Sequence, residues 1–136
     1  MVTSSFYKIS VVNKSFFYSK NFLLQNILGP LFYVSGATFD MKENTIVTNC
    51  TNDDNLSPLM SFDSSNIYLN DSTFYDLKSD LYSPIINLQN NILELGNCSF
   101  SDFDKSLFQI VSGTYYFYDL TVHTSNMVWQ MGDIIF

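Results

Sequence analysis

The chain of 136 residues contains no arginine, and its six lysines face thirteen carboxylates, which gives a formal net charge of −7. Proteins that bind nucleic acid use clustered lysine and arginine to displace counterions from phosphate, so we expect no nucleic-acid partner. The same shortage of positive charge argues against binding to an anionic membrane surface. No apolar run approaches the roughly 20 residues that a membrane-spanning helix needs, so we expect no membrane insertion.

Residues 1–12 lack the basic start, the long apolar run and the small-residue cleavage site of a signal peptide. We therefore expect either a soluble intracellular protein or a segment of a longer protein whose targeting sequence lies elsewhere.

Cysteine and histidine are scarce. The two cysteines, Cys50 and Cys98, are too few for a disulfide framework and occupy different positions of the repeat described below, so we expect unpaired or externally paired thiols. His123 is the only histidine and has no cysteine or histidine near it in the sequence, so we expect an exposed structural residue there. We predict no metal and no cofactor.

Aromatic residues are abundant, with thirteen phenylalanines and nine tyrosines, whereas only 14% of the residues are charged. These proportions favour β structure over surface helices, which carry many charged residues.

Large apolar residues recur in a fixed pattern. Starting at Phe32 they stand at offsets 0, 2, 7, 9 and 14, and the same offsets fit four other blocks and the start of a further one. The apolar positions are, block by block, Ile9, Val11, Phe16, Tyr18 and Leu23; Phe32, Val34, Phe39, Met41 and Ile46; Met60, Phe62, Ile67, Leu69 and Phe74; Ile86, Leu88, Leu93, Leu95 and Phe100; Phe108, Ile110, Tyr115, Phe117 and Val122; and Trp129, Met131 and Phe136. The three prolines, Pro30, Pro58 and Pro84, each precede a first apolar position by two residues, which supports a structural repeat.

Each block reads as three short strands joined by polar corners, because apolar residues two apart share one face of a strand. Blocks of this length and pattern match single turns of a parallel β-helix. We predict an all-β solenoid of about five and a half coils that forms a single domain or a fragment of one over residues 1–136. The coils begin near residues 7, 30, 58, 84, 106 and 127, and residues 49–57 and 77–83 form outward loops.

The two ends of this solenoid carry no polar cap in the sequence. An uncapped end is an open sheet edge, so we expect either a piece of a longer protein or contact with like modules or copies of the chain, end to end. The residues expected to stack at the ends are Ile9, Val11, Trp129, Met131, Ile135 and Phe136.

The repeat pattern over about residues 6–136 resembles the pectin-lyase-like superfamily of right-handed parallel β-helices, in particular the Asn-, Ser- and Phe-rich forms in very large protist surface proteins. The resemblance implies a right-handed coil, and either polysaccharide cleavage or passive adhesion and scaffolding.

The catalytic residues that the resemblance implies are not found in the sequence. The lyase branch uses an arginine or lysine base with calcium-binding carboxylates, and the hydrolase branch uses paired aspartates with a Gly-His-Gly element. Here the lysines are scattered, no Gly-His-Gly occurs, and the nearest acid pair, Asp53 and Asp54, lies in the longest insertion, which we interpret as a solvated loop. We predict no catalytic residues.

Five Asn-x-Ser/Thr sequons fall at corners or in the long loop, where a glycan can project into solvent. Their asparagines are Asn13, Asn49, Asn55, Asn70 and Asn97. We expect at least one of them to be glycosylated, which implies secretion.

Two further sets of polar and aromatic residues invite interpretation. A column of hydroxyls at one corner, predicted as Thr45, Thr73, Ser99 and Thr121, suits a hydrogen-bonded ladder better than an array of nucleophiles. Aromatic residues expected to point outward either stack on sugar rings or reflect strand propensity alone. These residues are Phe17, Tyr33, Tyr68, Tyr116 and Tyr118.

The sequence thus predicts a non-enzymatic extracellular or cell-surface module, structural or adhesive, glycan-bearing and joined end to end into a rod or filament. The alternatives are a carbohydrate-binding or polysaccharide-cleaving β-helix and an intracellular scaffold with reduced thiols.

Overall fold

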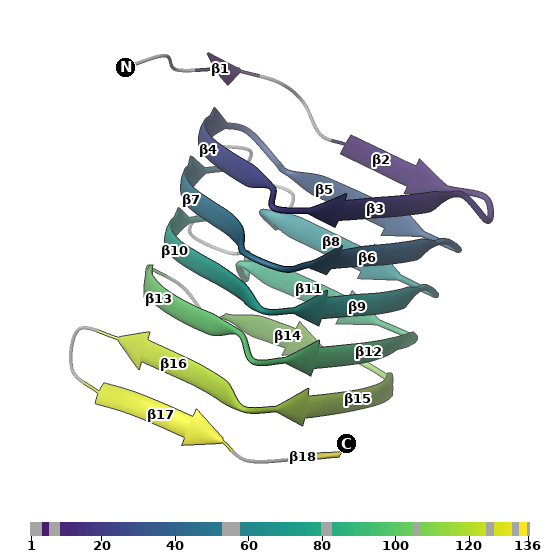
Figure 1. Cartoon of the computed structure of the whole chain (residues 1–136). Helices are drawn as coiled ribbons and strands as arrows, with labels where there is room; N and C mark the ends of the chain where they lie inside the picture. Colours follow the sequence, from purple (N-terminus) through teal and green to yellow (C-terminus); the bar gives the residue numbers. More distant parts are fainter. Residues whose placement is uncertain are drawn as a thin grey trace.

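The computed structural model describes residues 4–5, 9–52, 58–79, 83–104, 107–124, 127–131 and 134–135. Every regular element within these ranges is a β-strand, and the strands form three sheets. Figure 1 shows the three sheets as the walls of one coil. The described part of the chain contains no helix long and apolar enough to cross a membrane.

Successive strands go to successive sheets. Sheet 1 contains β2 (Ile9–Val12), β5 (Phe32–Ser35), β8 (Met60–Asp63), β11 (Ile86–Gln89) and β14 (Phe108–Ile110). Sheet 2 contains β3 (Phe16–Lys20), β6 (Thr38–Lys42), β9 (Asn66–Asn70), β12 (Asn91–Gly96), β15 (Gly113–Tyr118) and β18 (Ile134–Ile135). Sheet 3 contains β1 (Ser4–Ser5), β4 (Leu23–Leu28), β7 (Thr45–Thr51), β10 (Ser72–Lys78), β13 (Ser99–Phe103), β16 (Leu120–Thr124) and β17 (Met127–Met131).

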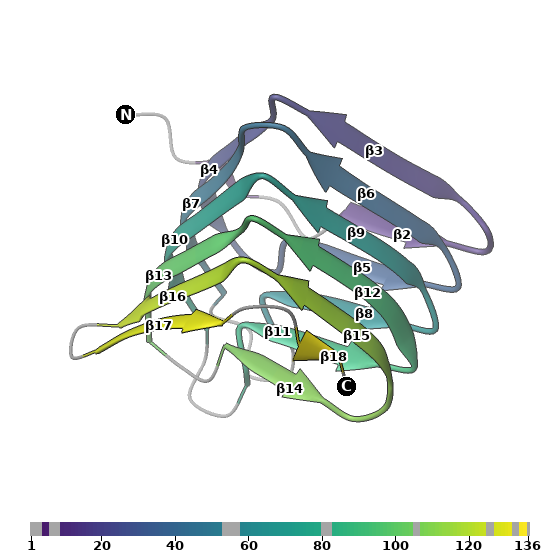
Figure 2. The same ribbon diagram turned by 60° about the horizontal axis from the view of Figure 1, so that its bottom comes forward.

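The predicted parallel β-helix is confirmed. From β2 to β16 each strand pairs in parallel with its equivalent in the next rung, where a rung is one strand from each sheet. Within the described ranges, four complete turns separate β2 from β14, and β15 and β16 complete a fifth rung. Figures 1 and 2 show that the chain turns clockwise as it recedes from its N-terminal end, which makes the coil right-handed.

The apolar columns of the middle and later rungs lie inside the coil as predicted. Phe39, for example, is 1% exposed and is paired in register with Phe17 on one side and Ile67 on the other. Phenylalanines also stack between rungs, with ring centroids of Phe74 and Phe100 4.6 Å apart. The interior is therefore a continuous apolar stack shared by neighbouring rungs, as solenoids require.

The predicted register is wrong by one residue in sheet 2 of the first rung. Phe16 and Tyr18, expected inside, are 63% and 50% exposed, whereas Phe17, expected outside, stacks on Phe39 with ring centroids 4.7 Å apart. The first corner of this rung holds two residues with positive φ, Asn13 and Lys14. The extra corner residue moves every later side chain of the strand to the opposite face.

The start of sheet 3 needs a similar correction in the first two rungs. Leu23 and Ile46 pair with each other on the outer face, and the inward positions belong to Leu24 and Val47. In the second rung the cause is a longer second corner, in which both Glu43 and Asn44 have positive φ.

The predicted hydroxyl column changes for the same reason. Thr45 is buried and pairs with Ser72, while Ile46 is the residue that pairs with Thr73. The lower part of the column is as predicted, because Thr73 pairs with Ser99 and Ser99 with Thr121.

The prolines mark the corner between sheets 3 and 1. The residues that follow the three prolines are fully buried, and they are Leu31, Leu59 and Ile85. Together with Leu107 they form an inner column that the predicted offsets of 0, 2, 7, 9 and 14 do not include. The backbone N–H of Leu31 donates to the carbonyl of Leu59 at 2.8 Å, so pairing between rungs resumes directly after the proline, which has no N–H to donate.

The sixth coil is not formed. β17 pairs antiparallel with β16, and β18 pairs antiparallel with β15, so the chain folds back along the lower edges of sheets 3 and 2. Apolar alternation is the same for a parallel continuation and for a hairpin, which is why the sequence pattern could not distinguish them. Trp129, Met131 and Ile135 lie on these reversed strands, and Phe136 lies outside the described residues.

At the C-terminal end, the reversed strands β17 and β18 are therefore the edge strands of sheets 3 and 2, and their outer edges pair with no other described strand. Sheet 1 ends at β14, which among the described strands pairs only with β11. At the other end, β2 pairs only with β5 within the described strands, with Ile9 half-buried and Val11 buried.

Candidate functional site

One corner of the coil, between sheets 2 and 3, carries a left-handed backbone residue in every rung. These residues are all asparagine or aspartate, with φ from 48° to 56°: Asn21, Asn44, Asp71, Asn97 and Asp119. Asparagine and aspartate are the side chains that tolerate this conformation best apart from glycine, because they hydrogen-bond locally. The corner is thus specified rung by rung by residue type.

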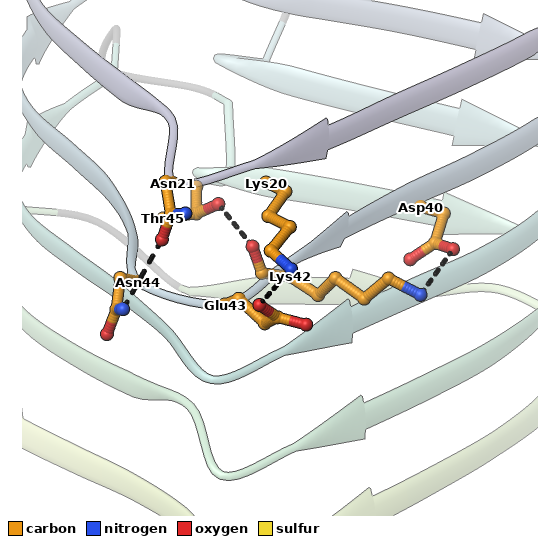
Figure 3. Close-up of polar contacts among 7 residues, drawn as sticks. All are labelled: Lys20, Asn21, Asp40, Lys42, Glu43, Asn44 and Thr45. Atoms are coloured by element: carbon orange, nitrogen blue, oxygen red, sulfur yellow. Dashed lines mark hydrogen bonds and ion pairs between the residues drawn. The ribbon is translucent and has the colours of Figure 1, made fainter.

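Side chains at this corner bond along the axis. Asn44 Nδ2 donates to Asn21 Oδ1 at 3.3 Å, and Asn97 Nδ2 donates to Asp71 Oδ1 at 2.8 Å. Figure 3 shows the upper part of this ladder beside the Lys20–Glu43 ion pair. Backbone bonds run in parallel, for example from Asn97 N to the carbonyl of Tyr118 at 2.8 Å.

An open groove of about 450 Å³ follows the ladder on the outside of the coil. Carboxylates, amides and hydroxyls dominate its walls, which are formed by Glu43, Asn44, Asp71, Ser72, Thr73, Asn97, Cys98, Ser99, Asp119 and Thr121. A surface of this kind can hydrogen-bond a polar ligand laid along the axis.

Cys98 borders the groove, but its thiol is turned away from it. Its thiol lies inside the coil, 3.3 Å from the carbonyl oxygen of Gly96, to which it donates. Burial raises the pKa of Cys98 to about 12, and the thiolate is the reactive form of cysteine. Burial likewise raises the pKa of Cys50 to about 11.

The carboxylates of the groove are spaced along the axis. Asp71 and Asp119 are two rungs apart, roughly 10 Å at the usual strand spacing, with Asn97 between them. Asp71 accepts the amide of Asn97, so it is a member of the ladder. Within the described residues no three His, Cys, Asp or Glu side chains gather closely enough to hold a metal ion.

A second ladder runs through sheet 3, where the strands of the first four rungs each bend at a left-handed residue. Its members are Asn26, Asn49, Asp76 and Asp102, with φ from 50° to 58°. Asn49 Nδ2 donates to Asn26 Oδ1.

The two ladders account for the sequons that contain a cysteine. Asn49 and Asn97 occupy left-handed corner positions, and the residue after each, Cys50 or Cys98, turns into the core and is at most 2% exposed. Both cysteines are free and buried.

The other sequons differ in accessibility. Asn13 is exposed at the corner between β2 and β3. Asn70 is half-buried, with its Oδ1 lying over Gly96, and Asn55 lies outside the described residues.

The remaining predicted residues are placed as follows. His123 is exposed on β16, as expected. Asp53 and Asp54 lie outside the described residues. Tyr68, Tyr116 and Tyr118 are half-buried on the outer face of sheet 2, and Tyr33 is 37% exposed on sheet 1.

Sequence reasoning missed the groove and its acidic residues Glu43, Asp71 and Asp119. A signal was present: asparagine or aspartate stands two residues after the fourth inward position in four of the five rungs, as in Leu95 and Asn97. The pattern of apolar residues alone could not reveal it, because the corners carry no apolar side chain.

An ion pair between Lys20 and Glu43 lies next to the groove. Lys20 Nζ lies 2.7 Å from Glu43 Oε2, and this hydrogen bond, with the attraction of the carboxylate, raises the pKa of Lys20. Both side chains are nearly half exposed, so the pair contributes little to stability.

Comparison with protein-family models, with curated proteins and with experimentally solved structures finds no match to this chain.

Proposed function

We propose that this chain is a non-enzymatic structural module, a rigid β-solenoid segment of an extracellular or cell-surface assembly. The observation that carries the proposal is the pair of axial ladders. They set the corner between sheets 2 and 3 in every rung and the bend within sheet 3 in the first four rungs, while the interior is filled by apolar columns. Such a coil resists bending and presents long flat faces, which is what a spacer or an adhesive surface needs.

The groove supports a structural role over a catalytic one. Asp71 is held by Asn97, and the thiol of Cys98 faces the core with a pKa of about 12. General acid–base catalysis of glycoside cleavage needs two carboxylates placed across a substrate, and one carboxylate of the groove, Asp71, already accepts a hydrogen bond within the ladder.

Glycosylation is part of the proposal, with Asn13 as the favoured acceptor. Asn13 is exposed at a corner, whereas the amides of Asn49 and Asn97 donate within the ladders. A glycan at Asn13 implies passage through a secretory pathway. A relationship to the pectin-lyase-like β-helices of large protist surface proteins belongs to the same proposal, and right-handed winding with three sheets is consistent with it.

End-to-end association with like modules or further copies completes the proposal. Sheet 1 offers a route, because among the described strands β2 and β14 each have one unpaired edge. β17 and β18 are the C-terminal edge strands of sheets 3 and 2 and run antiparallel to the coil, whereas β14 keeps the parallel direction of the coil, so we place the contact at sheet 1.

The second candidate function, binding or cleavage of a polysaccharide, rests on the acidic groove. The two functions are distinguished by incubating the purified protein with acidic polysaccharides, with and without calcium, and measuring the length of the polymer. The structural proposal expects unchanged polymer length. Shortening by the wild type that is lost in the Asp71→Asn/Asp119→Asn double variant would overturn it in favour of an enzyme.

Mass spectrometry of protein from its native source tests the glycan. We expect a sugar at Asn13 and its loss in Asn13→Gln. If every sequon is unmodified, the proposed glycosylation and the argument for secretion both fail.

A further inference from the structure

The outer face of sheet 2 carries a column in which tyrosines and carboxylates alternate along the axis. Register places Tyr18, Asp40, Tyr68, Glu94 and Tyr116 side by side in rungs one to five. Each carboxylate therefore has a tyrosine on the strand above it and another on the strand below it, at roughly 4.8 Å strand spacing.

The carboxylate of the second rung already holds an ammonium group. Lys42 Nζ lies 3.3 Å from Asp40 Oδ2 and 5.3 Å from the centroid of the Tyr18 ring. A cation over an aromatic face beside a carboxylate gains from both the ring quadrupole and the negative charge. Figure 3 shows Lys42 extended along the sheet towards Asp40.

The carboxylate of the fourth rung has the same neighbours but no lysine. Lys42 follows Met41 in β6, and the corresponding residue after Leu95 in β12 is Gly96. Glu94 is exposed, and within the described residues it makes no ion pair. Asn70 Oδ1 occupies the space over Gly96 where a side-chain stem would begin, so an incoming lysine reaches Glu94 from the side of Ile92.

We propose that Glu94, between Tyr68 and Tyr116, binds a lysine side chain of a partner protein. The ammonium takes the place that Lys42 fills at Asp40, and the aliphatic stem lies on Ile92, which is 51% exposed on the same strand. The net charge of −7 attracts a basic partner to this face. This inference goes beyond the proposed structural function and does not depend on secretion or on a glycan.

The outer face of sheet 2 around Glu94 suits a lysine side chain better than a metal ion. The site is open and flat, and Glu94 is its one carboxylate. It therefore cannot surround a small inorganic cation with ligands. An alkylammonium group instead gains from ring faces and from an apolar surface at once.

The test uses NMR titration of the labelled full chain with Nα-acetyl-lysine methylamide. We expect chemical-shift changes centred on Glu94, Tyr68 and Tyr116. Glu94→Gln should weaken binding at least fivefold. The matched control Asp102→Asn removes one exposed carboxylate from sheet 3 and should bind as the wild type does.

Three probes make the result decisive. The Nε-acetylated ligand, which has no positive charge, should not bind, and calcium should not displace the lysine ligand. Lys42→Ala should create a second site at Asp40 and Tyr18. The proposal is overturned if the shifts are unchanged in Glu94→Gln, if they spread evenly over the acidic residues, or if calcium competes.

Discussion

Phe17 packs into the first rung of the coil while its neighbour Phe16 points into solvent. The Phe17 ring stacks on Phe39 and meets Phe32 and Phe22 edge-on, with centroids 5.6 and 6.5 Å away. Two identical side chains, adjacent in one strand, thus differ mainly in the face on which they lie. At the residue scale this makes them a matched pair for testing the register.

Phe17→Ala should lower the free energy of unfolding by about 2–4 kcal/mol, because it empties space between packed rings. Phe16→Ala should change it by less than about 1 kcal/mol, since surface substitutions are usually small. Urea unfolding followed by circular dichroism measures both. Equal losses, or a larger loss for Phe16→Ala, would show that the first rung has the register with Phe16 inside.

The buried thiols predict a pH dependence. Burial raises the pKa values of Cys50 and Cys98 from 9.0 to about 11 and about 12. Above pH 9 the folded chain therefore keeps protons that the unfolded chain loses. This contribution to stability is present below pH 9 and is lost as pH rises through about 11 for Cys50 and about 12 for Cys98, by up to about 1.4 kcal/mol per pH unit for each thiol.

Unfolding measured between pH 8 and 10.5 tests this effect against the Cys50→Ala/Cys98→Ala double variant. The variant should be less stable at pH 8 but should lose stability more slowly as pH rises. An identical slope in both proteins would mean that the thiols are not buried as described.

At the scale of elements, the corners decide where each strand starts and which face it buries. The left-handed residues at the sheet 2 to sheet 3 corner turn the chain from one sheet into the next, and their side chains link rungs. A corner that is one residue longer, as at Glu43 and Asn44, shifts the following strand by one position.

Asn97 offers a direct test of the ladder. Asn97→Ala should cost about 1–3 kcal/mol, because alanine disfavours a φ of 48° and the bond to Asp71 is lost. Asn97→Gly also loses the bond to Asp71, but glycine adopts the left-handed conformation readily. Its loss in free energy of unfolding should therefore be smaller than that of Asn97→Ala by about 1 kcal/mol. The comparison is made by thermal and urea unfolding. If glycine is as costly as alanine, backbone conformation is not what asparagine supplies there.

The sequence predicts the coil well because large apolar residues such as Phe39, Ile67 and Leu93 must face the interior and recur once per rung. It predicts corners less well, because one additional polar residue, as at Lys14, leaves no apolar signal. The groove was missed since its residues lie at those corners, and the fold-back of β17 was missed because strand direction does not alter alternation.

At the scale of the whole molecule, the end-to-end association that we propose uses the open edges of sheet 1. Ile110 occupies an inward position of β14, yet it is 40% exposed at the end of the coil. An exposed apolar edge strand is a template for pairing with another chain.

Ile110→Lys should reduce concentration-dependent self-association, because a buried ammonium at the contact is costly. Gln109→Lys adds the same charge on the outer face of the same strand and serves as control. Light scattering over a range of concentrations measures the mass. Equal association by all three proteins would place the contact elsewhere, and a monomer at every concentration would remove end-to-end stacking from the proposed function.

The stacking of equivalent residues in successive rungs is tested most directly by nuclear Overhauser contacts between aromatic and methyl protons in solution. The structure predicts contacts from Phe39 to Phe17 and to Ile67, and from Phe74 to Phe100, with Phe16 free of contacts to Phe39. Contacts from Phe39 to Phe16 in place of Phe17, or the absence of contacts between these residues of successive rungs, would contradict the coil described here.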